Sequence, residues 1–282
     1  MNEKGIVLGK GFFGTKISKQ LGYELIGKDK LDPSDFSSLE EYLDSENPDV
    51  IINAVAKTGK TNTDWCEENR GITLESNVLV PSNIARFCSD RKFFFVHLSS
   101  GGIYNGNNEG KGFSEEDKPN FYGPQFYIMT KIMAEEILMQ YPCLILRPNL
   151  FISDEPHPRN LITRLAQYSS VTEEKNSMTV VPDMTNAMKE LIKKRALGIY
   201  NVVNPGTISP AEIMGMYKEI VDPTHSFSIM SSKTLNEKIK TKRSNCFLSS
   251  DKLNEAGIFL PDIYSAVRDC MIKYKRNMNG HS

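Results

Sequence analysis

Gly5-Ile6-Val7-Leu8 is followed at once by Gly9-Lys10-Gly11-Phe12-Phe13-Gly14, and this junction indicates the class of fold. The apolar run predicts a buried strand, and the glycines after it have the spacing G-x-G-x-x-G. Where a strand turns into a helix, such glycines allow a tight turn, a close approach of a pyrophosphate to the backbone, and close packing of helix on strand. The junction therefore predicts a dinucleotide-binding βαβ unit, with the phosphate at the amino end of the helix.

The rest of the first half of the chain alternates short apolar runs with amphipathic stretches. We expect strands at residues 5–8, 23–26, 50–54, 93–98 and 143–147, and helices that begin near Phe12, Ser37, Ile72 and Gln125. This alternation is typical of an α/β fold with a doubly wound parallel sheet of the Rossmann type. Ligands of such a sheet gather at the carboxyl ends of its strands.

After about residue 150 the pattern loosens, because frequent prolines divide it into short helices and loops. A further strand is expected at residues 199–204 and returns to the main sheet. We therefore predict a dinucleotide-binding domain at residues 1–150, to which residues 176–204 return. Residues 151–175 and 205–282 are predicted to form a small C-terminal substrate-binding lobe.

The charge balance excludes some classes of partner. Lys and Arg number 34 and Asp and Glu number 35, so the net charge is −1 and no global field attracts nucleic acid or an anionic membrane. No apolar segment approaches the roughly 20 residues of a membrane span. We expect a cytoplasmic protein that binds neither nucleic acid nor membrane.

The cysteines and histidines have no metal-ligand spacing. The four histidines form no ligand cluster, and no C-x-x-C pair occurs among the five cysteines, which are Cys66, Cys88, Cys143, Cys246 and Cys270. We expect thiols that are mostly buried in apolar surroundings, and no metal ion.

The residues after the second strand bear on the choice of dinucleotide. Lys28 and Lys30 could neutralise the 2′-phosphate of NADP, whereas Asp29 keeps binding of the NAD ribose open. Each lysine could equally be a solvated loop residue. We expect NADP(H) as the cofactor.

Tyr127 is the one tyrosine among eleven that has a lysine, Lys131, four positions later. On a helix this spacing places both side chains on one face. An ammonium close to a phenol lowers the pKa of the phenol, which suits proton transfer during carbonyl reduction. Lys131 could also hold the nicotinamide ribose. The alternative is an ordinary amphipathic helix whose isoleucines pack inward.

Ser100 follows the fourth predicted strand and precedes Tyr127 by 27 residues. A hydroxyl at this position can donate a hydrogen bond to a substrate carbonyl oxygen as negative charge develops on it. Serines at strand ends also act simply as turn formers. The order of the surrounding motifs favours the catalytic role.

Several longer segments carry a resemblance to a known family. The chain resembles the extended short-chain dehydrogenase/reductases and, more narrowly, is similar to the UDP-L-rhamnose synthases of plants and giant viruses. The resemblance covers residues 5–275 and rests on residues 58–67, 115–121, 158–163, 176–179, 204–206 and 243–245. It implies a bifunctional enzyme, by analogy a homodimer, that epimerises UDP-4-keto-6-deoxy-glucose at C3 and C5 and then reduces C4 with NADPH.

The resemblance also implies roles for individual residues. Asn77 matches the family's active-site asparagine, and Arg243 with Lys242 would bind the UDP pyrophosphate. Further substrate contacts are expected from Lys60, Asn149, Arg159, Asn160 and Asn176. Beyond the glycine turn, Lys28, Lys30 and Lys131, the candidate cofactor contacts are Asp35, Phe36, Asn53, Ala54 and Ala56.

The sequence departs from the plant relatives at two positions expected to serve epimerisation. Gly102 stands where the relatives have a cysteine, and Arg164 stands where they have a lysine. Arginine is a poor proton donor or acceptor because its pKa is so high. Other candidate acids or bases for this step are Cys66, Lys57, Lys60 and Tyr104.

Two alternatives to the bifunctional enzyme follow from the same residues. The first is a reductase alone, similar to the dTDP-4-keto-rhamnose reductases, with epimerisation performed by another protein. The second is a nucleotide-binding regulatory subunit that keeps the fold without the chemistry. Retention of the tyrosine, lysine and serine argues against the second.

Overall fold

The computed structural model of the chain describes residues 3–59, 63–122, 125–231, 234–235 and 243–279. It divides into two compact units. Unit 1 consists of Met1–Ile103, Phe121–Arg147 and Met188–Tyr200, and unit 2 of Tyr104–Asn120, Pro148–Ala187 and Asn201–Ser282. Each unit has its own hydrophobic core.

Unit 1 is built on one sheet of six strands. The strands are β1 (Gly5–Leu8), β2 (Glu24–Ile26), β3 (Val50–Asn53), β4 (Phe94–Leu98), β5 (Cys143–Arg147) and β9 (Gly198–Asn201), and their order is β2-β1-β3-β4-β5-β9. The neighbouring pairs from β2 to β5 are parallel. The expected doubly wound fold is therefore confirmed, and each expected strand matches an observed one to within a few residues.

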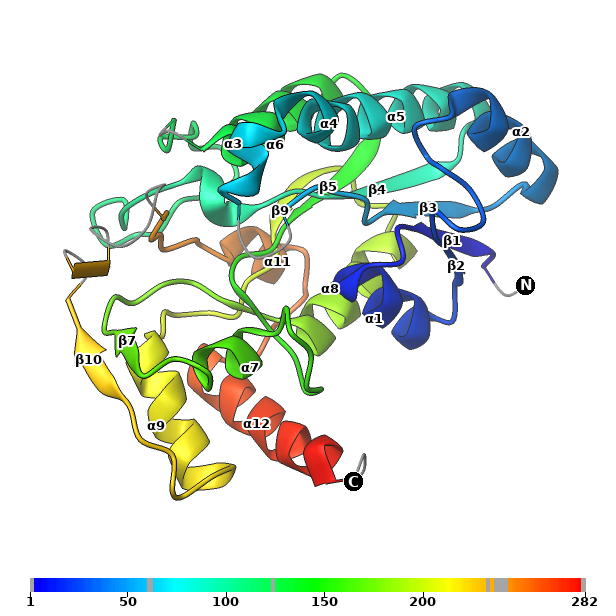
Figure 1. Cartoon of the computed structure of the whole chain (residues 1–282). Helices are drawn as coiled ribbons and strands as arrows, with labels where there is room; N and C mark the ends of the chain where they lie inside the picture. The colour runs from blue at the N-terminus through cyan, green and yellow to red at the C-terminus, as the bar shows by residue number, and fades with distance from the viewer. Residues whose placement is uncertain (1–2, 60–62, 123–124, 232–233, 236–242, 280–282) are drawn as a thin grey trace. The chain divides into compact units, whose positions relative to one another are not determined.

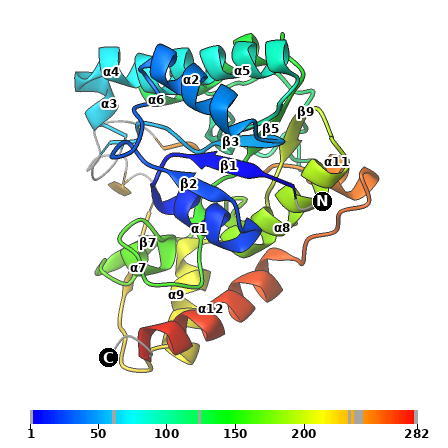
Figure 2. The ribbon, with the colours of Figure 1, turned by 90° about the vertical axis from the view of Figure 1, so that its right-hand side faces the viewer.

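Helices cover both faces of this sheet. Figures 1 and 2 show α2 (Phe36–Glu46), α5 (Val80–Arg91) and α6 (Phe126–Leu138) over one face, and α1 (Phe12–Leu21) over the other. The core between them is made of aliphatic and aromatic side chains of the strands and helices, with Ile6, Ile51 and Phe95 almost completely buried. Because the central strands are covered on both faces, their residues are mostly apolar and do not alternate between apolar and polar.

The helical run before β4 changes its hydrogen-bond pattern in the middle. Two short helices, α3 (Trp65–Glu68) and α4 (Arg70–Leu74), lead into a π-helical turn over Glu75–Leu79, and α5 continues from it. Pro81 lies at the start of α5 and cannot donate a hydrogen bond to the carbonyl of Asn77. The wider turn accommodates this missing bond, and such turns occur often at functional sites.

Unit 2 contains shorter elements around a second core. Its strands form two parallel pairs, β7 (Ser170–Thr172) with β10 (Ser228–Met230) and β6 (Phe151–Ile152) with β8 (Thr179–Val180). Figure 1 shows two of its helices, α9 (Pro210–Ile220) and α12 (Ile263–Asn279), side by side. The smaller helices are α7 (Leu161–Leu165) and α11 (Asp251–Glu255), while α8 (Val181–Lys193) runs from unit 2 into unit 1.

The units differ in extent from the domains expected from the sequence. Residues 104–120 belong to unit 2, although they fall within the expected first domain, and only residues 188–200 of the expected returning segment belong to unit 1. Segment 104–120 joins unit 2 through backbone hydrogen bonds, among them Gly106 N to Asn245 O at 2.8 Å and Phe113 N to Phe247 O at 2.8 Å. Pairing between segments so distant in sequence leaves no local pattern.

Across the described part of the chain, every helix is too short or too polar to cross a lipid bilayer. All five cysteines lie within the described residues; each is buried and none forms a disulfide.

Candidate active site

The helix that carries Tyr127 is anchored at its first residue by a neighbouring helix. Gln125 provides no side-chain cap for α6, and the carboxylate of Glu67 on α3 accepts the hydrogen bond of the Phe126 N–H instead. Arg70 pairs with Glu67 at 3.1 Å and lies over the Phe126 ring at 5.1 Å. The position of Tyr127, which is half-buried, is thereby fixed from outside its own helix.

Lys131 lies one turn after Tyr127 and its side chain is almost completely buried. Its Nζ atom donates a hydrogen bond of 2.9 Å to the carbonyl oxygen of Leu98, the last residue of β4. Burial lowers the pKa of Lys131 to about 8, while the charge of Glu135 acts in the opposite direction. A lysine whose pKa is lowered in this way can take part in proton transfer with a phenol near neutral pH.

Ser100 lies two residues after the last residue of β4, Leu98. Its Oγ atom accepts a hydrogen bond of 3.1 Å from the Gly102 N–H, at the start of a short 3-10 turn over Gly101–Ile103. Ser100 therefore does form a turn, yet a hydroxyl that accepts one bond retains its own hydrogen for donation. The turn fixes the oxygen and leaves the donor that the proposed catalytic role requires.

Asn77 is fully buried in the π-helical turn, and its carboxamide joins two segments. The Oδ1 atom accepts from Lys57 N at 2.7 Å, and Nδ2 donates to Lys57 O at 3.0 Å and to Thr130 Oγ1 at 3.1 Å. Thr130 in turn donates to the carbonyl oxygen of Tyr127 at 2.7 Å. Asn77 thus ties the loop after β3 to the helix of the tyrosine.

The expected dinucleotide turn has the shape that its glycines require. A Cβ atom on Gly9 would lie 2.9 Å from backbone atoms of Ala54 and Val55, and one on Gly14 would lie 1.8 Å from the Gly9 carbonyl oxygen. A Cβ atom on Gly11, the N-cap of α1, would meet nothing within 4 Å. Helix α1 has no side-chain cap. The turn is tight where it must pack and open at the helix amino end, and it fits a bound pyrophosphate.

Sequence reasoning missed three polar residues beneath this site: His97, Glu135 and Arg147. His97 and Arg147 are charged or ionisable residues inside otherwise apolar strands, and Glu135 continues the spacing of four from Tyr127 and Lys131. Both signals were present in the sequence. All three side chains are buried.

Asn53, the last residue of β3, links His97 to the start of the loop that follows β3. The fully buried Asn53 contacts His97 Nδ1 through its Nδ2 atom at 3.1 Å, and its Oδ1 atom accepts from Val55 N at 3.1 Å. A carboxamide nitrogen only donates, so the His97 proton is on Nε2. Burial, assisted by the charge of Lys131, holds the pKa of His97 well below its usual value, and the ring is neutral.

A family model described as the RmlD substrate binding domain matches residues 6–276. The chain belongs to this family. The bifunctional dTDP-4-dehydrorhamnose 3,5-epimerase/dTDP-4-dehydrorhamnose reductase of Arabidopsis thaliana is 33% identical over 247 residues, which cover 85% of this chain and 80% of the relative. The crystal structure of the L780 UDP-rhamnose synthase of Acanthamoeba polyphaga mimivirus superimposes with a TM-score of 0.90 at 28% identity, and covers 97% of this chain and all of the other.

Longer relatives contain an equivalent region. The trifunctional UDP-glucose 4,6-dehydratase/UDP-4-keto-6-deoxy-D-glucose 3,5-epimerase/UDP-4-keto-L-rhamnose-reductase RHM2 of Arabidopsis thaliana is 33% identical over 272 residues, 94% of this chain. The RmlD-family chain spans only 40% of that relative's length. The resemblance to UDP-L-rhamnose synthases inferred from the sequence is confirmed.

The lysines expected near the 2′-phosphate already have carboxylate partners in this RmlD-family chain. Lys28 pairs with Asp32 at 2.7 Å and Lys30 with Glu24 at 2.7 Å, and each carboxylate raises the pKa of its lysine. Lys10, inside the glycine turn, lies 3.3 Å from Asp29. All of these pairs are largely exposed, so exchange of a carboxylate for a phosphate costs little.

The other expected cofactor contacts have local roles. Asp35 caps α2 by accepting from Ser38 N at 3.2 Å, and Phe36, the first residue of that helix, packs on the core of unit 1. Ala54 and Ala56 lie in the loop after β3, where Ala54 is half-buried and Ala56 exposed.

Two of the expected substrate residues are hydrogen-bonded to each other in unit 2. Asn149 Nδ2 donates to Asn176 Oδ1 at 2.9 Å and to Ser177 O at 2.8 Å. Asn160 is separate from them: its buried carboxamide caps α7 and bonds to Ser153 N, Ser153 O and Glu155 O. All four hydrogen-bonding positions of Asn160 are used within the chain.

The remaining expected substrate residues are basic. Arg159 is exposed and Arg243 half-buried. Lys60 and Lys242 lie outside the described residues.

The candidates for the epimerisation step are placed very differently from one another. Cys66 is buried, and this burial raises the pKa of its thiol, which disfavours the thiolate at neutral pH. Tyr104 is also buried and its hydroxyl donates to Asp117 O at 2.7 Å. Gly102 lies in the turn held by Ser100, while Lys57 and Arg164 are half-buried.

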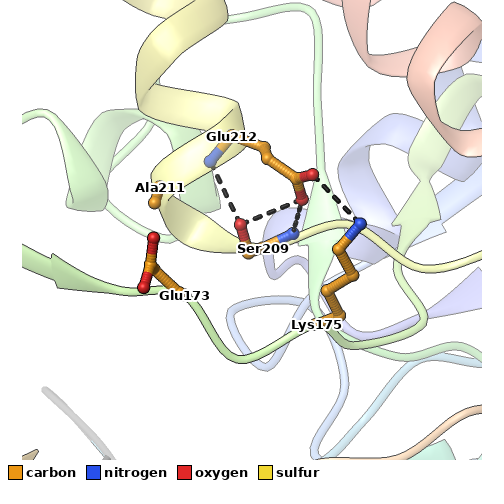
Figure 3. A pocket seen from close by; sticks show the side chains of 5 residues that line it. All are labelled: Glu173, Lys175, Ser209, Ala211 and Glu212. Carbon is orange, nitrogen blue, oxygen red and sulfur yellow. Dashed lines mark hydrogen bonds and ion pairs between the residues drawn. The ribbon is translucent and has the colours of Figure 1, made fainter. Parts of the chain in front are cut away.

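A cavity of about 320 Å³ in unit 2 lies next to Asn176, although none of the residues expected to bind ligands is among its lining residues. Its lining residues are Glu173, Lys175, Ser209, Ala211 and Glu212. Figure 3 shows Lys175 and Glu212 pointing toward each other, with their charged atoms 3.1 Å apart. Ser209 and Glu212 form a capping box at the start of α9. Lys175, Ser209 and Glu212 therefore have hydrogen-bond or ion-pair partners among one another, which is typical of a structural role.

Proposed function

We propose that this chain catalyses the NADPH-dependent reduction of UDP-4-keto-6-deoxy-glucose, together with its epimerisation at C3 and C5, to UDP-L-rhamnose. The observation that carries the proposal is the buried Lys131 ammonium, hydrogen-bonded to the end of β4 one helical turn from Tyr127. The similarity to the bifunctional relative of Arabidopsis thaliana and to the mimivirus UDP-rhamnose synthase supports the same chemistry.

The residues of unit 1 fit a bound dinucleotide. Gly9, Gly11 and Gly14 would hold the pyrophosphate at the start of α1, where the open side of Gly11 leaves room for it. Lys10, Lys28 and Lys30 would meet the 2′-phosphate, and Lys131 would bind the nicotinamide ribose. When bound, the reduced nicotinamide supplies the hydride for the carbonyl carbon.

The side chains of this chain would then handle the developing charge and the proton. The Tyr127 hydroxyl donates its proton to the C4 oxygen, and the Lys131 ammonium lowers the cost of the phenolate that remains. Ser100 donates a hydrogen bond to the same oxygen while negative charge grows on it. Asn77 acts through its bonds to Lys57 and Thr130, as a positioning residue rather than as a proton donor.

One oxyanion site could serve both reactions, because C3 and C5 flank the C4 carbonyl and their protons become acidic when its oxygen is stabilised. The chain does not reproduce the cysteine and lysine of the plant relatives, and we propose that another base removes these protons. Raised pKa and burial make Cys66 a weak candidate. Lys57, whose backbone Asn77 holds, is a better one.

We propose that Asn149, Asn176, Arg159 and Arg243 contact the nucleotide sugar, with Lys60 as a further contact. Asn160 is less suited, since its carboxamide is committed to the chain. By analogy with the family we also propose a cytoplasmic homodimer. The absence of disulfides among the five described cysteines agrees with a reducing compartment. Light scattering of the purified chain would test the dimer.

Product analysis tests the proposed function directly. The purified chain would be incubated with NADPH and UDP-4-keto-6-deoxy-glucose, and the products identified by NMR. The bifunctional enzyme yields UDP-L-rhamnose, whereas a reductase alone yields a product that keeps the D-configuration. No NADPH consumption with UDP- or dTDP-linked keto-sugars, combined with a stoichiometric co-purifying protein, would contradict the proposal and favour a regulatory subunit.

A further inference from the structure

A buried ion pair in unit 1 begins one helical turn after Lys131. Glu135 is on α6, one turn after Lys131, and Arg147 is the last residue of β5. The Arg147 Nε atom lies 3.0 Å from Glu135 Oε1, and its second guanidinium nitrogen lies 2.6 Å from Oε2. The side chains are only 6% and 3% exposed. An ion pair so far from water is maintained only if its geometry is good.

The same carboxylate reaches the end of β4. Ser99 donates its hydroxyl hydrogen to Glu135 Oε1, and its own backbone N–H bonds to Leu146 O at 2.8 Å. Ser99 stands between Leu98, which accepts from Lys131, and Ser100, which we expect to bind the substrate oxygen. Glu135 therefore connects the helix of Tyr127 and Lys131 to the strand end that carries Ser100.

Four ionisable groups surround or adjoin the Lys131 ammonium. Tyr127 and Glu135 lie one turn before and one turn after Lys131 on α6, the neutral His97 lies on β4, and Arg147 of β5 pairs with Glu135. Among them Glu135 supplies the negative charge. In a fully buried setting, loss of one unit of negative charge weighs strongly on an ammonium, because little water is present to screen it.

We propose that Glu135, held by Arg147 and Ser99, is a positioning residue that keeps the Lys131 ammonium charged and in register with the carboxyl end of β4. This role rests on the proposed function, since it concerns the proton step of Tyr127 and Lys131. It differs from simple stabilisation of the fold. A buried salt bridge contributes little net stability compared with apolar residues of similar size.

The direct test is a titration of Lys131 in the chain without cofactor. The ¹³Cε resonance of Lys131, assigned by its loss in Lys131→Met, is followed from pH 6 to pH 11 in the wild type and in Glu135→Gln. Glu135→Gln keeps the size of the side chain and removes its charge. We expect the pKa of Lys131 to fall by at least about one pH unit. Glu136→Gln is the matched control, because Glu136 is the next residue of the same helix and is exposed.

The second readout is the pH dependence of kcat/KM for keto-sugar reduction. Removing the negative charge favours both the neutral amine and the phenolate, so the alkaline limb should move to lower pH. Glu136→Gln should leave both the titration and the pH profile unchanged. A Glu135→Gln variant that loses activity while Lys131 titrates as in the wild type would show a merely structural role and would overturn the proposal.

Glu135→Gln leaves the Arg147 charge buried without its partner, and an uncompensated buried charge can prevent folding. The double variant Glu135→Gln/Arg147→Gln removes both charges and is the second test. The pKa of Lys131 should still fall, since Glu135 is the charge that acts on it; an unchanged titration would equally overturn the proposal. A wild type that reduces no keto-sugar would refute the proposed function, and the titration would still decide the role of Glu135.

Discussion

The Nζ atom of Lys131 lies 2.9 Å from the carbonyl oxygen of Leu98. This hydrogen bond joins the helix that carries Tyr127 to the strand end that precedes Ser100. It also keeps the ammonium on the side of α6 that faces the sheet, although the surroundings disfavour a charge. The proposed proton donor Tyr127, its proposed electrostatic partner Lys131 and the expected oxyanion donor Ser100 therefore lie on two elements that this contact holds together.

Tyr127→Phe should lower the rate of keto-sugar reduction by at least about two orders of magnitude, because the ring remains and the transferable proton is lost. Binding of NADPH, measured by fluorescence titration, should be retained. Tyr122→Phe is the matched control, since Tyr122 is 60% exposed and precedes the same helix. Unchanged turnover of Tyr127→Phe would refute the assigned role.

Lys131→Met should abolish reduction and stabilise the fold at pH 7. Burial lowers the pKa of Lys131 from 10.5 to about 8, so the folded state bears the cost of the charge below pH 8 and loses that cost as the pH rises to 10.5. This difference between the two pKa values of Lys131 corresponds to roughly 3 kcal/mol in the free energy of unfolding. Glu135 keeps Arg147 as a partner in this variant.

Urea unfolding at several pH values checks the Lys131→Met prediction. The variant should be more stable than the wild type at pH 7, and the gap should narrow between pH 8 and 10.5. A gap that stays constant over this range would mean that burial of the charge is not its cause.

Gly11→Ala and Gly14→Ala should separate cofactor binding from folding. A Cβ atom on Gly11 meets no atom within 4 Å, so Gly11→Ala should fold normally but weaken NADPH binding by about tenfold or more, equivalent to about 1.4 kcal/mol. A Cβ atom on Gly14 would lie 1.8 Å from the Gly9 carbonyl oxygen, and Gly14→Ala should destabilise the fold by at least about 1–3 kcal/mol.

Calorimetric titration with NADPH and thermal unfolding distinguish the two glycine variants. Gly215→Ala, at another open position on α9, serves as control for both measurements. Full-strength NADPH binding by Gly11→Ala would argue against a pyrophosphate at this turn.

Asn77→Ala should lower both stability and kcat. The substitution leaves the Lys57 N–H and carbonyl without their buried partners, which costs about 1–3 kcal/mol. It also releases Thr130, and with it the backbone of Tyr127. Unfolding by urea and steady-state kinetics measure the two effects, with Asn83→Ala on α5 as control. A stable variant with normal kcat would contradict the bridging role.

Much of unit 1 was readable from the sequence. The glycine turn, the strands and the helix of Tyr127 are each encoded in a few consecutive residues. Turn geometry requires particular residue types, and burial of one or both faces of an element produces a regular spacing of apolar residues in the sequence. The spacing of four placed Tyr127 and Lys131 on one helical face, and the order of motifs placed Ser100 after the fourth strand. The family was recognisable for the same reason.

Only the tertiary structure decided how distant polar groups pair. It assigned Glu135 to Arg147, Asn77 to Lys57 and Thr130, and the lysines after β2 to neighbouring carboxylates. It also moved residues 104–120 into unit 2 through bonds to residues 245–249. Such pairings depend on which side chains the packed core brings within hydrogen-bonding distance, and that proximity has no period along the chain.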